Sequence, residues 1–164
     1  MKQAVIAAIV ALSLTGCSPG GADAAHSPAT SALASPAVHP ESGLRIIPLT
    51  VTHGRAVHRF NVELAQSDRE QAHGLMFRRA MGANEGMLFP MQPPRHASFW
   101  MRNTVISLDI IFVGTDRRVL NIAANTVPYL EEPLPSDGAV SAVLELVGGR
   151  AAQLGIMPGD KVEW

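Results

Sequence analysis

The chain has little cysteine, few aromatic residues and no run of charge of one sign. Its one cysteine, Cys17, leaves the rest of the 164 residues without a disulfide, a thiol nucleophile or a cysteine ligand for a metal. Thirteen basic and 14 acidic residues give a formal net charge of −1, so nucleic acid is not expected as a partner. The sequence contains no Gly-x-Ser-x-Gly and no phosphate-binding loop, and so no complete catalytic motif.

The chain does have enough apolar material for a packed core. Apolar residues make up 47% of it and charged residues 16%, which excludes the composition of a disordered protein. The length suits one domain with appendages.

The first residues have the pattern of an export signal. Residues 4–14 form an uncharged apolar run, too short to span a membrane core, which needs roughly 20 helical residues. The run ends in Leu14-Thr15-Gly16-Cys17, which resembles the lipobox of bacterial lipoproteins. The resemblance implies a signal peptide over residues 1–16, cleavage before Cys17 and lipidation of its sulfur. An ordinary signal peptide that happens to contain a cysteine is the alternative.

These features predict where the protein works and where its domain begins. Residues 17–42 are rich in Pro, Ala, Ser and Gly without apolar periodicity, which indicates a flexible linker behind the lipidated cysteine. We expect an exported lipoprotein held at the membrane by lipid on Cys17. Ser18 in place of Asp favours the periplasmic side of the outer membrane in a Gram-negative cell. Residues 43–164 form the predicted domain.

The predicted domain is mainly β with one true α-helix, a compact β-sandwich or barrel-like fold. Ser67 and Glu70 have capping-box spacing and predict a helix over 68–77, with Gly74 inside it for close packing. A shorter helix is expected over 149–154. Period-two alternation around 47–51 and 60–64, with a turn at His53-Gly54 between them, predicts a hairpin. Further strands are expected over 86–89, 98–102, 108–113, 119–123, 140–146 and 161–163.

A set of motifs across the domain resembles a known family. These are Gly74-Leu75-Met76-Phe77-Arg78, Gly86-Met87-Leu88-Phe89, Phe99-Trp100-Met101-Arg102-Asn103-Thr104, Leu108-Asp109-Ile110-Ile111-Phe112 and Val143-Leu144-Glu145-Leu146. Their order is similar to that of the family known as domain of unknown function 192, over about residues 49–163. The resemblance implies a small β-rich fold and no established activity. The family usually has proline before the Leu-Asp pair, where this chain has Ser107.

Asp109 is the candidate catalytic residue. It lies in an apolar segment where a carboxylate is costly to bury without partners. It could act as an acid, a base or a ligand-binding group. Alternatively it accepts hydrogen bonds from the Asn103-Thr104 bend or pairs with Arg78 or Arg102. We favour the structural role.

A second set of candidates surrounds this segment. A ligand-binding surface would comprise Arg78, Trp100, Asn103 and Asp109, although Asn103 also suits a turn and Trp100 also suits a core. Soft thioethers with a histidine could bind Cu(I), which makes Met76, Met87, His96 and Met101 weak candidates for metal ligands. Core packing explains the methionines better, so no cofactor is expected.

Two functions therefore stand beside each other. The first is a non-catalytic binding or accessory domain at the membrane, for a small ligand, an envelope polymer or an envelope protein. The alternative is an envelope hydrolase in which Asp109 acts with a second carboxylate, Glu63 or Glu145. Two carboxyl groups about 5–9.5 Å apart across an open groove would favour the enzyme. A buried Asp109 bound only by backbone amides would argue against it.

Overall fold

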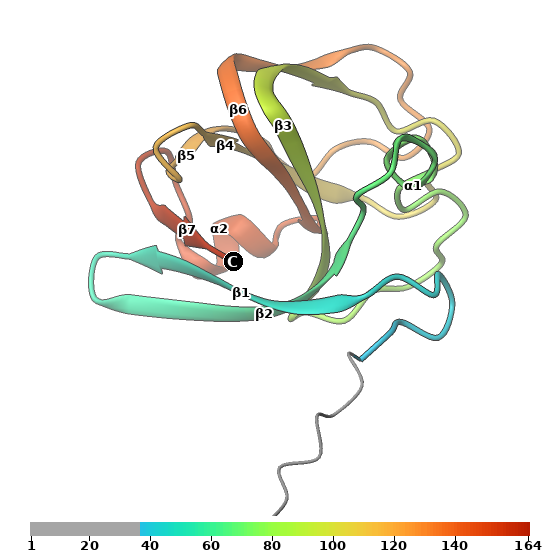
Figure 1. The fold of residues 1–164 in the computed structure, drawn as a ribbon, viewed down its shortest axis with the longest axis horizontal. Coiled ribbons are helices and arrows are strands. Elements are labelled where there is room, and N and C mark those ends of the chain that lie inside the picture. The colour runs from blue at the N-terminus through green and yellow to red at the C-terminus, as the bar shows by residue number, and fades with distance from the viewer. Residues whose placement is uncertain (1–36) are drawn as a thin grey trace, which may run out of the picture. The chain divides into compact units, whose positions relative to one another are not determined.

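The computed structural model describes residues 37–164, and these residues form one curled β-sheet with two very short helices (Figure 1). The predicted signal peptide, Cys17 and most of the predicted linker lie outside the described residues. The elements are β1 (Ile46–His53), β2 (Ala56–Leu64), α1 (Asp68–His73), β3 (Glu85–Phe99), β4 (Leu108–Gly114), β5 (Val119–Ala123), β6 (Leu134–Val147), α2 (Arg150–Leu154) and β7 (Lys161–Glu163). Neither helix is long and apolar enough to cross a membrane.

The sheet curls so far that its two edges meet at one end. Its strand order is β5-β4-β6-β3-β2-β1-β7, and β2 with β3 is the one parallel pair in residues 37–164. The N–H of Val119 donates to the carbonyl of Asp160 at 2.8 Å, and the N–H of Val162 donates to the carbonyl of Arg117 at 2.8 Å. These bonds join β7 at one edge to the start of β5 at the other, which makes the sheet a half-barrel.

The sheet has an apolar cluster on each face. The inner cluster lies within the curl, and its members include Val51, Val62, Leu88, Ile111, Leu144, Leu146 and Val162. Figure 1 shows α2 lying within this curl, and its Ala151 belongs to the same cluster. The outer cluster includes Leu75, Met87, Phe89, Met101, Leu108, Ile110, Phe112 and Val143. β4 contributes to both clusters and is buried along its whole length, as its almost unbroken apolar run predicts.

Gly86 allows β3 and β6 to lie close together. A Cβ at this position would collide with the backbone carbonyl of Glu145 on β6. Glycine is therefore required for the close approach of the two longest strands.

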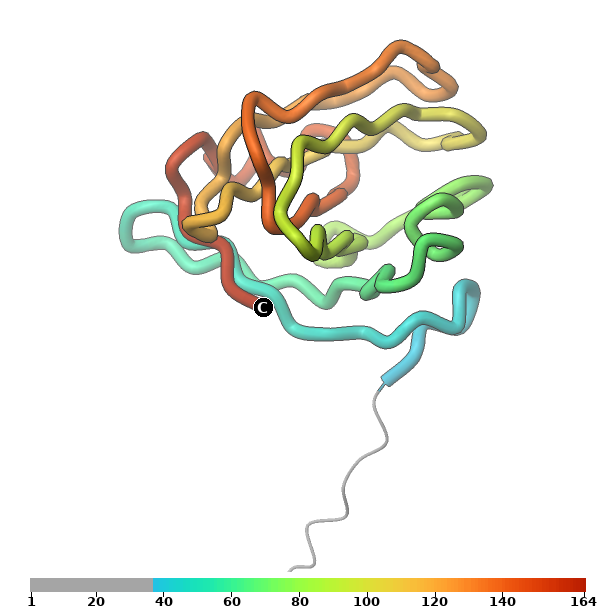
Figure 2. The backbone as a smooth tube through the Cα atoms, turned by 45° about the horizontal axis from the view of Figure 1, so that its top comes forward, coloured from blue at the N-terminus to red at the C-terminus, as the bar shows by residue number. Residues whose placement is uncertain are grey.

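Three loops cover the outer cluster and are joined by backbone hydrogen bonds. The N–H of Phe77 donates to the carbonyl of Asn103 at 2.8 Å, and the N–H of Met101 donates to the carbonyl of Leu130 at 2.7 Å. The N–H of Tyr129 donates to the carbonyl of Thr104 at 3.2 Å. Figure 2 shows these loops gathered at one end of the sheet, on the side where the described chain begins.

The mainly β prediction is confirmed, with a single curled sheet rather than two packed sheets. The strands over 119–123 and 161–163 have the predicted bounds. The segments predicted separately over 86–89 and 98–102 are largely one bulged strand, β3, which ends at Phe99. The prediction of a helix to residue 77 is wrong: α1 ends at His73, because Gly74 caps it with φ of 48°.

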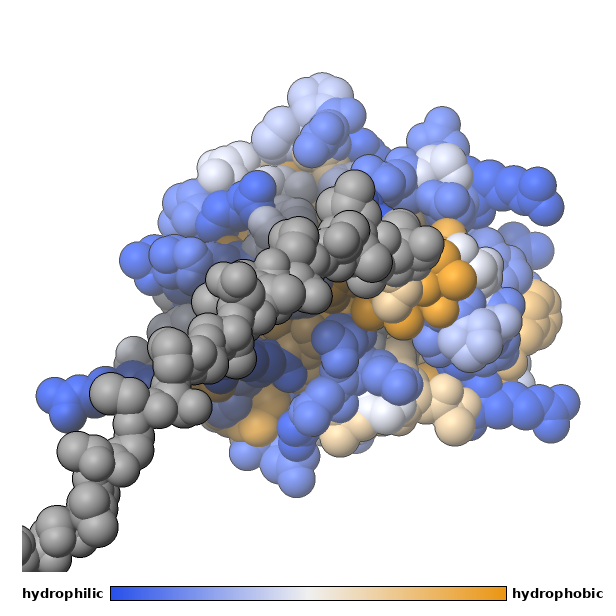
Figure 3. Space-filling view, turned by 60° about the horizontal axis from the view of Figure 1, so that its bottom comes forward, coloured by the Kyte–Doolittle hydropathy of each residue, from blue (hydrophilic) through white to orange (hydrophobic). Residues whose placement is uncertain are grey.

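Residues 38 and 41, which precede residue 43, contact the rest of the domain. Val38 forms a β-bridge with Arg45, and Glu41 makes an ion pair with Arg78. Figure 3 shows the face where the described chain begins: polar residues cover much of it, and an apolar patch lies beside that point.

Candidate functional site

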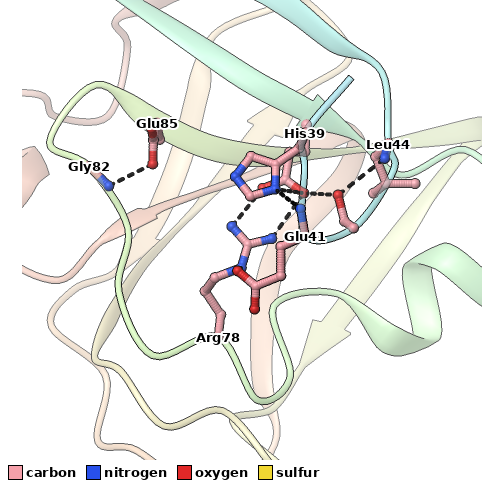
Figure 4. Close-up of polar contacts among 8 residues, drawn as sticks. His39, Glu41, Leu44, Arg78, Gly82 and Glu85 are labelled. Atoms are coloured by element: carbon pink, nitrogen blue, oxygen red, sulfur yellow. Dashed lines mark hydrogen bonds and ion pairs between the residues drawn. The ribbon is translucent and has the colours of Figure 1, made fainter. Parts of the chain in front are cut away.

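A buried ion pair between Arg78 and Glu63 lies beside residues 39–42, near the start of the described residues (Figure 4). The guanidinium of Arg78 donates to both carboxylate oxygens of Glu63 on β2, at 2.8 and 3.0 Å. Its Nε lies 3.0 Å from a carboxylate oxygen of Glu41, and the hydroxyl of Ser42 donates to Glu63. Burial lowers the pKa of Arg78, but the hydrogen bond and charge of Glu63 and the charge of Glu41 raise it by more.

This cluster explains Arg78 as a structural residue. The side chains of Arg78 and Glu63 are 6% and 4% exposed, and each satisfies the other's charge. The pair fixes the loop after α1 to β2 and holds residues 39–42 against both. The guanidinium of Arg78 therefore faces protein partners, and we assign it no contact with a ligand.

Asp109 is completely buried and is bound by backbone amides. One carboxylate oxygen accepts hydrogen bonds from the N–H groups of Asn125 and Gly149, at 2.7 and 3.0 Å, and the other accepts from Ala151 at 2.7 Å. The carboxylate thus joins the loop after β5 to the start of α2. The prediction that Asp109 contacts the Asn103-Thr104 bend, Arg78 or Arg102 is wrong. A structural role for Asp109 fits this geometry.

The sheet register separates the acids that a hydrolase would need to combine. Glu63 pairs with Met87, Met87 pairs with Glu145, and Glu145 pairs with Ile110, which places both glutamates on the outer face. Asp109 pairs with Leu146, whose side chain belongs to the inner cluster. Side chains alternate between faces along a strand, so Asp109 points away from both glutamates. The pair of carboxylates proposed for a hydrolase around Asp109 is not formed.

Glu145 has the least satisfied carboxyl group on the outer face. It lies on β6, is 5% exposed, and receives no hydrogen bond or ion pair from residues 37–164. Its oxygens are not among the fully enclosed polar atoms without a partner, so they keep a small contact with the cavity that they line. Burial alone raises the pKa of Glu145 to about 8. The carboxyl is therefore mostly protonated at neutral pH and becomes negative when a cation or a stronger donor approaches.

Glu145 lines a small cavity of about 40 Å³, named here the Glu145 cavity. Its other walls are the turn that ends α1, the aromatic rings of Phe89, Phe99 and Trp100, and the side chains of Arg102 and Thr104. An adjoining hollow of about 270 Å³, the outer hollow, shares Gln71, Ala72, Phe99 and Trp100 with it and extends to Arg95 and His96. We call the two together the groove.

Trp100 stands at the rim of the groove. The residue is 53% exposed, so it does not close the core, and the guanidinium carbon of Arg102 lies 5.9 Å from its ring centre. A half-exposed indole beside a buried carboxyl is an arrangement suited to holding a ligand. Of the four predicted ligand-binding residues, Trp100 is the one that lines the groove, and the sequence interpretation gave Glu145 only a minor role.

The remaining candidates have structural surroundings. Asn103 adopts a left-handed conformation, with φ of 56°, and its amide nitrogen lies 3.7 Å from the sulfur of Met76, as suits a turn residue. The sulfur of Met101 accepts from the hydroxyl of Thr126 at 3.1 Å. Met87 and Met101 are fully buried in the outer cluster, while His96 is exposed on β3. Within residues 37–164 no three His, Cys, Asp or Glu side chains are grouped to hold a metal.

The fold and groove define a class: small, single-sheet half-barrel domains with a groove beneath crossing loops. The chain belongs to the family DUF192, described as "Uncharacterized ACR", whose model matches residues 49–164. No curated protein matches the chain.

Two solved structures are similar. One is a protein of unknown function from Novosphingobium aromaticivorans DSM 12444, with 64% identity and a TM-score of 0.78 over 80% of this chain and 94% of that one. The other, from Sinorhizobium meliloti 1021, is provisionally described as a transcription regulator. It has 35% identity and a TM-score of 0.71 over 73% of this chain and 94% of that chain.

Proposed function

We propose that this protein is an envelope lipoprotein whose domain binds a small ligand in the groove, without catalysing a reaction. The observation that carries the proposal is the carboxyl of Glu145, buried without a partner beneath an exposed Trp100. A ligand that donates a hydrogen bond to this carboxylate gains about 1.5–3 kcal/mol, the usual range for a hydrogen bond to a charged group. A hydrolase is not favoured, because Asp109 holds backbone amides on the other face.

Binding can be tested with the low-molecular-weight fraction of cell envelopes. The full chain in a non-ionic detergent is incubated with the fraction, washed, and the retained compounds are identified by mass spectrometry. We expect a compound that the unaltered chain retains and that Trp100→Ala and Glu145→Leu lose. Val57→Ala is the matched control, since Val57 is 45% exposed on the β1–β2 hairpin. Retention of nothing, or equal retention by all variants, would overturn the binding proposal.

The membrane anchor is a separate part of the proposal and rests on the lipobox at residues 14–17. Lipid chains add about 0.8 kcal/mol of membrane affinity per buried CH₂, so two or three chains hold a protein firmly. Cys17→Ser is expected to leave an uncleaved precursor without lipid, observed as a mass difference. Maturation and membrane association of that variant as in the unaltered protein would show that the anchor is wrong.

A further inference from the structure

Glu145 is the one acid among the polar side chains that line the groove, and it receives no hydrogen bond from residues 37–164. The amide nitrogen of Gln71 donates to the carbonyls of Ala65 and Pro90, at 3.2 and 2.9 Å. The hydroxyl of Thr104 donates to the carbonyl of Arg102 at 3.3 Å. The groove therefore combines this single acid with the basic side chains of Arg95 and Arg102 and with aromatic rings.

The size and walls of the Glu145 cavity favour an ammonium group. The 40 Å³ of the Glu145 cavity is a few times the roughly 10–15 Å³ that one water molecule needs, so the group that meets Glu145 has only a few non-hydrogen atoms. A charged donor makes a hydrogen bond roughly twice as strong as a neutral one. The faces of Phe99 and Trp100 attract cations, as the position of Arg102 over Trp100 shows.

The basic side chains that line the groove favour an anion as well as a cation. Arg102 and His73 line the Glu145 cavity, Arg95 and His96 line the outer hollow, and Glu145 is the one acid among the described residues that line either. The two arginines would repel a ligand that carries positive charge alone. An acidic group on the same ligand, placed toward Arg102, would convert this repulsion into attraction.

Resting on the binding function proposed above, we infer that the ligand is a small zwitterion whose primary ammonium group meets Glu145 and whose acidic group meets Arg102. An amino acid carries this chemistry, and so does the phosphoethanolamine headgroup of a lipid. The aliphatic stem between the charges lies against Phe99 and Trp100. Binding is accompanied by release of a proton from Glu145, since the ammonium group stabilises the carboxylate.

The test compares probes that carry one charge or both. The full chain in a non-ionic detergent is titrated by calorimetry with n-butylamine, butyrate, 4-aminobutyrate and O-phosphoethanolamine, and by sedimentation with phosphatidylethanolamine vesicles. At least one zwitterion is expected to bind about tenfold or more tightly than both butylamine and butyrate. At pH 7 its binding should release up to about 0.9 proton, measured from the dependence of the heat on the buffer. Binding of 4-aminobutyrate alone points to a free amino acid; vesicle binding points to a lipid.

Two variants separate the two ends of the ligand. Glu145→Gln should lose the proton release and at least about tenfold in affinity, and Arg102→Gln should bring the zwitterion to the affinity of butylamine. Glu163→Gln, at an exposed acid of β7, is the control, and circular dichroism checks that each variant folds. Equal affinity for butylamine and the zwitterions, or no effect of Arg102→Gln, would overturn the zwitterion inference while leaving the binding function. The zwitterion inference would also be overturned if the envelope screen finds an uncharged compound whose retention is lost in Trp100→Ala and Glu145→Leu.

Discussion

At the scale of single residues, Glu145 makes the stability of the domain depend on pH. Its pKa rises from 4.5 to about 8 on burial, so the folded state binds a proton that the unfolded state has released between these values. The stabilisation that this proton gives the folded state is fully present below pH 4.5 and is lost as the pH rises through about 8. At about 1.4 kcal/mol per pH unit, the free energy of unfolding changes by roughly 5 kcal/mol over this range. Glu145→Gln should flatten this dependence, measured by urea denaturation from about pH 5 to 8.5.

A carbon-13 NMR titration of the Glu145 carboxyl gives an independent measurement. The carboxyl should titrate near 8, and Trp100 fluorescence in a Trp164→Phe background should follow the same transition, because both side chains line one cavity. A carboxyl that titrates near 4.5, with parallel stability curves for Glu145→Gln and the unaltered chain, would contradict the burial described here.

The Glu63–Arg78 pair should be costly to break from either side. Arg78→Met leaves the buried carboxylate of Glu63 without its bidentate partner, and the loss of one member of such a pair costs about 3–5 kcal/mol. The free energy of unfolding from urea titration measures the loss. Glu163→Gln, which breaks the exposed Lys161–Glu163 pair, should change it by less than about 1 kcal/mol. A loss of similar size in the two variants would refute the structural role of Arg78.

The sequence pointed to Asp109 more strongly than to Glu145 for a physical reason. Asp109 interrupts an apolar run, so its burial and its need for partners can be predicted from the segment itself. Glu145 lies between Leu144 and Leu146, and this alternation is typical of a strand whose leucines face the core and whose glutamate faces water. Its burial comes from loops distant in the sequence, which strand periodicity does not encode.

At the scale of elements, the Asp109 carboxylate holds the start of α2. Asp109→Asn replaces one acceptor oxygen with a donor, so at least one of the N–H groups of Asn125, Gly149 and Ala151 loses its partner. We expect a loss of about 1–3 kcal/mol in the free energy of unfolding and faster hydrogen exchange at Ala151. The exposed Asp137→Asn is the control. Unchanged exchange at Ala151 would show that α2 does not depend on this carboxylate.

Ser107, just before Leu108 and Asp109, stands where the family usually has proline, and its hydrogen bonds hold this segment in place. The family's usual proline is absent, and the hydroxyl of Ser107 instead donates to the carbonyl of Thr126 at 2.7 Å, with the side-chain oxygen of Asn125 at 3.0 Å. Gly148 leaves room for that hydroxyl, where a Cβ would collide with it. Side-chain hydrogen bonds of Ser107 therefore hold the segment before Asp109, where the family usually has proline.

At the scale of the whole molecule, β7 closes the curl and should couple the two edges of the sheet. It pairs with β1 through residues 50–52, and Val162 of β7 and the preceding Asp160 bond to Arg117 and Val119 at the start of β5. Val162, in the centre of β7, is fully buried in the inner cluster. Val162→Ala removes buried methyl groups and leaves a cavity, for a cost of about 2 kcal/mol.

The coupling can be measured by hydrogen exchange at both edges. Because Val119 donates its N–H to Asp160, loosening β7 in Val162→Ala should speed exchange at Val119 as well as in β1. Glu163→Ala, an exposed change in the same strand, should leave both edges protected. If exchange rises in β1 alone, the contact with β5 contributes nothing to closure, and the domain behaves as an open sheet. If both edges change together, the three residues of β7 join the most distant strands of the sheet into one cooperative unit.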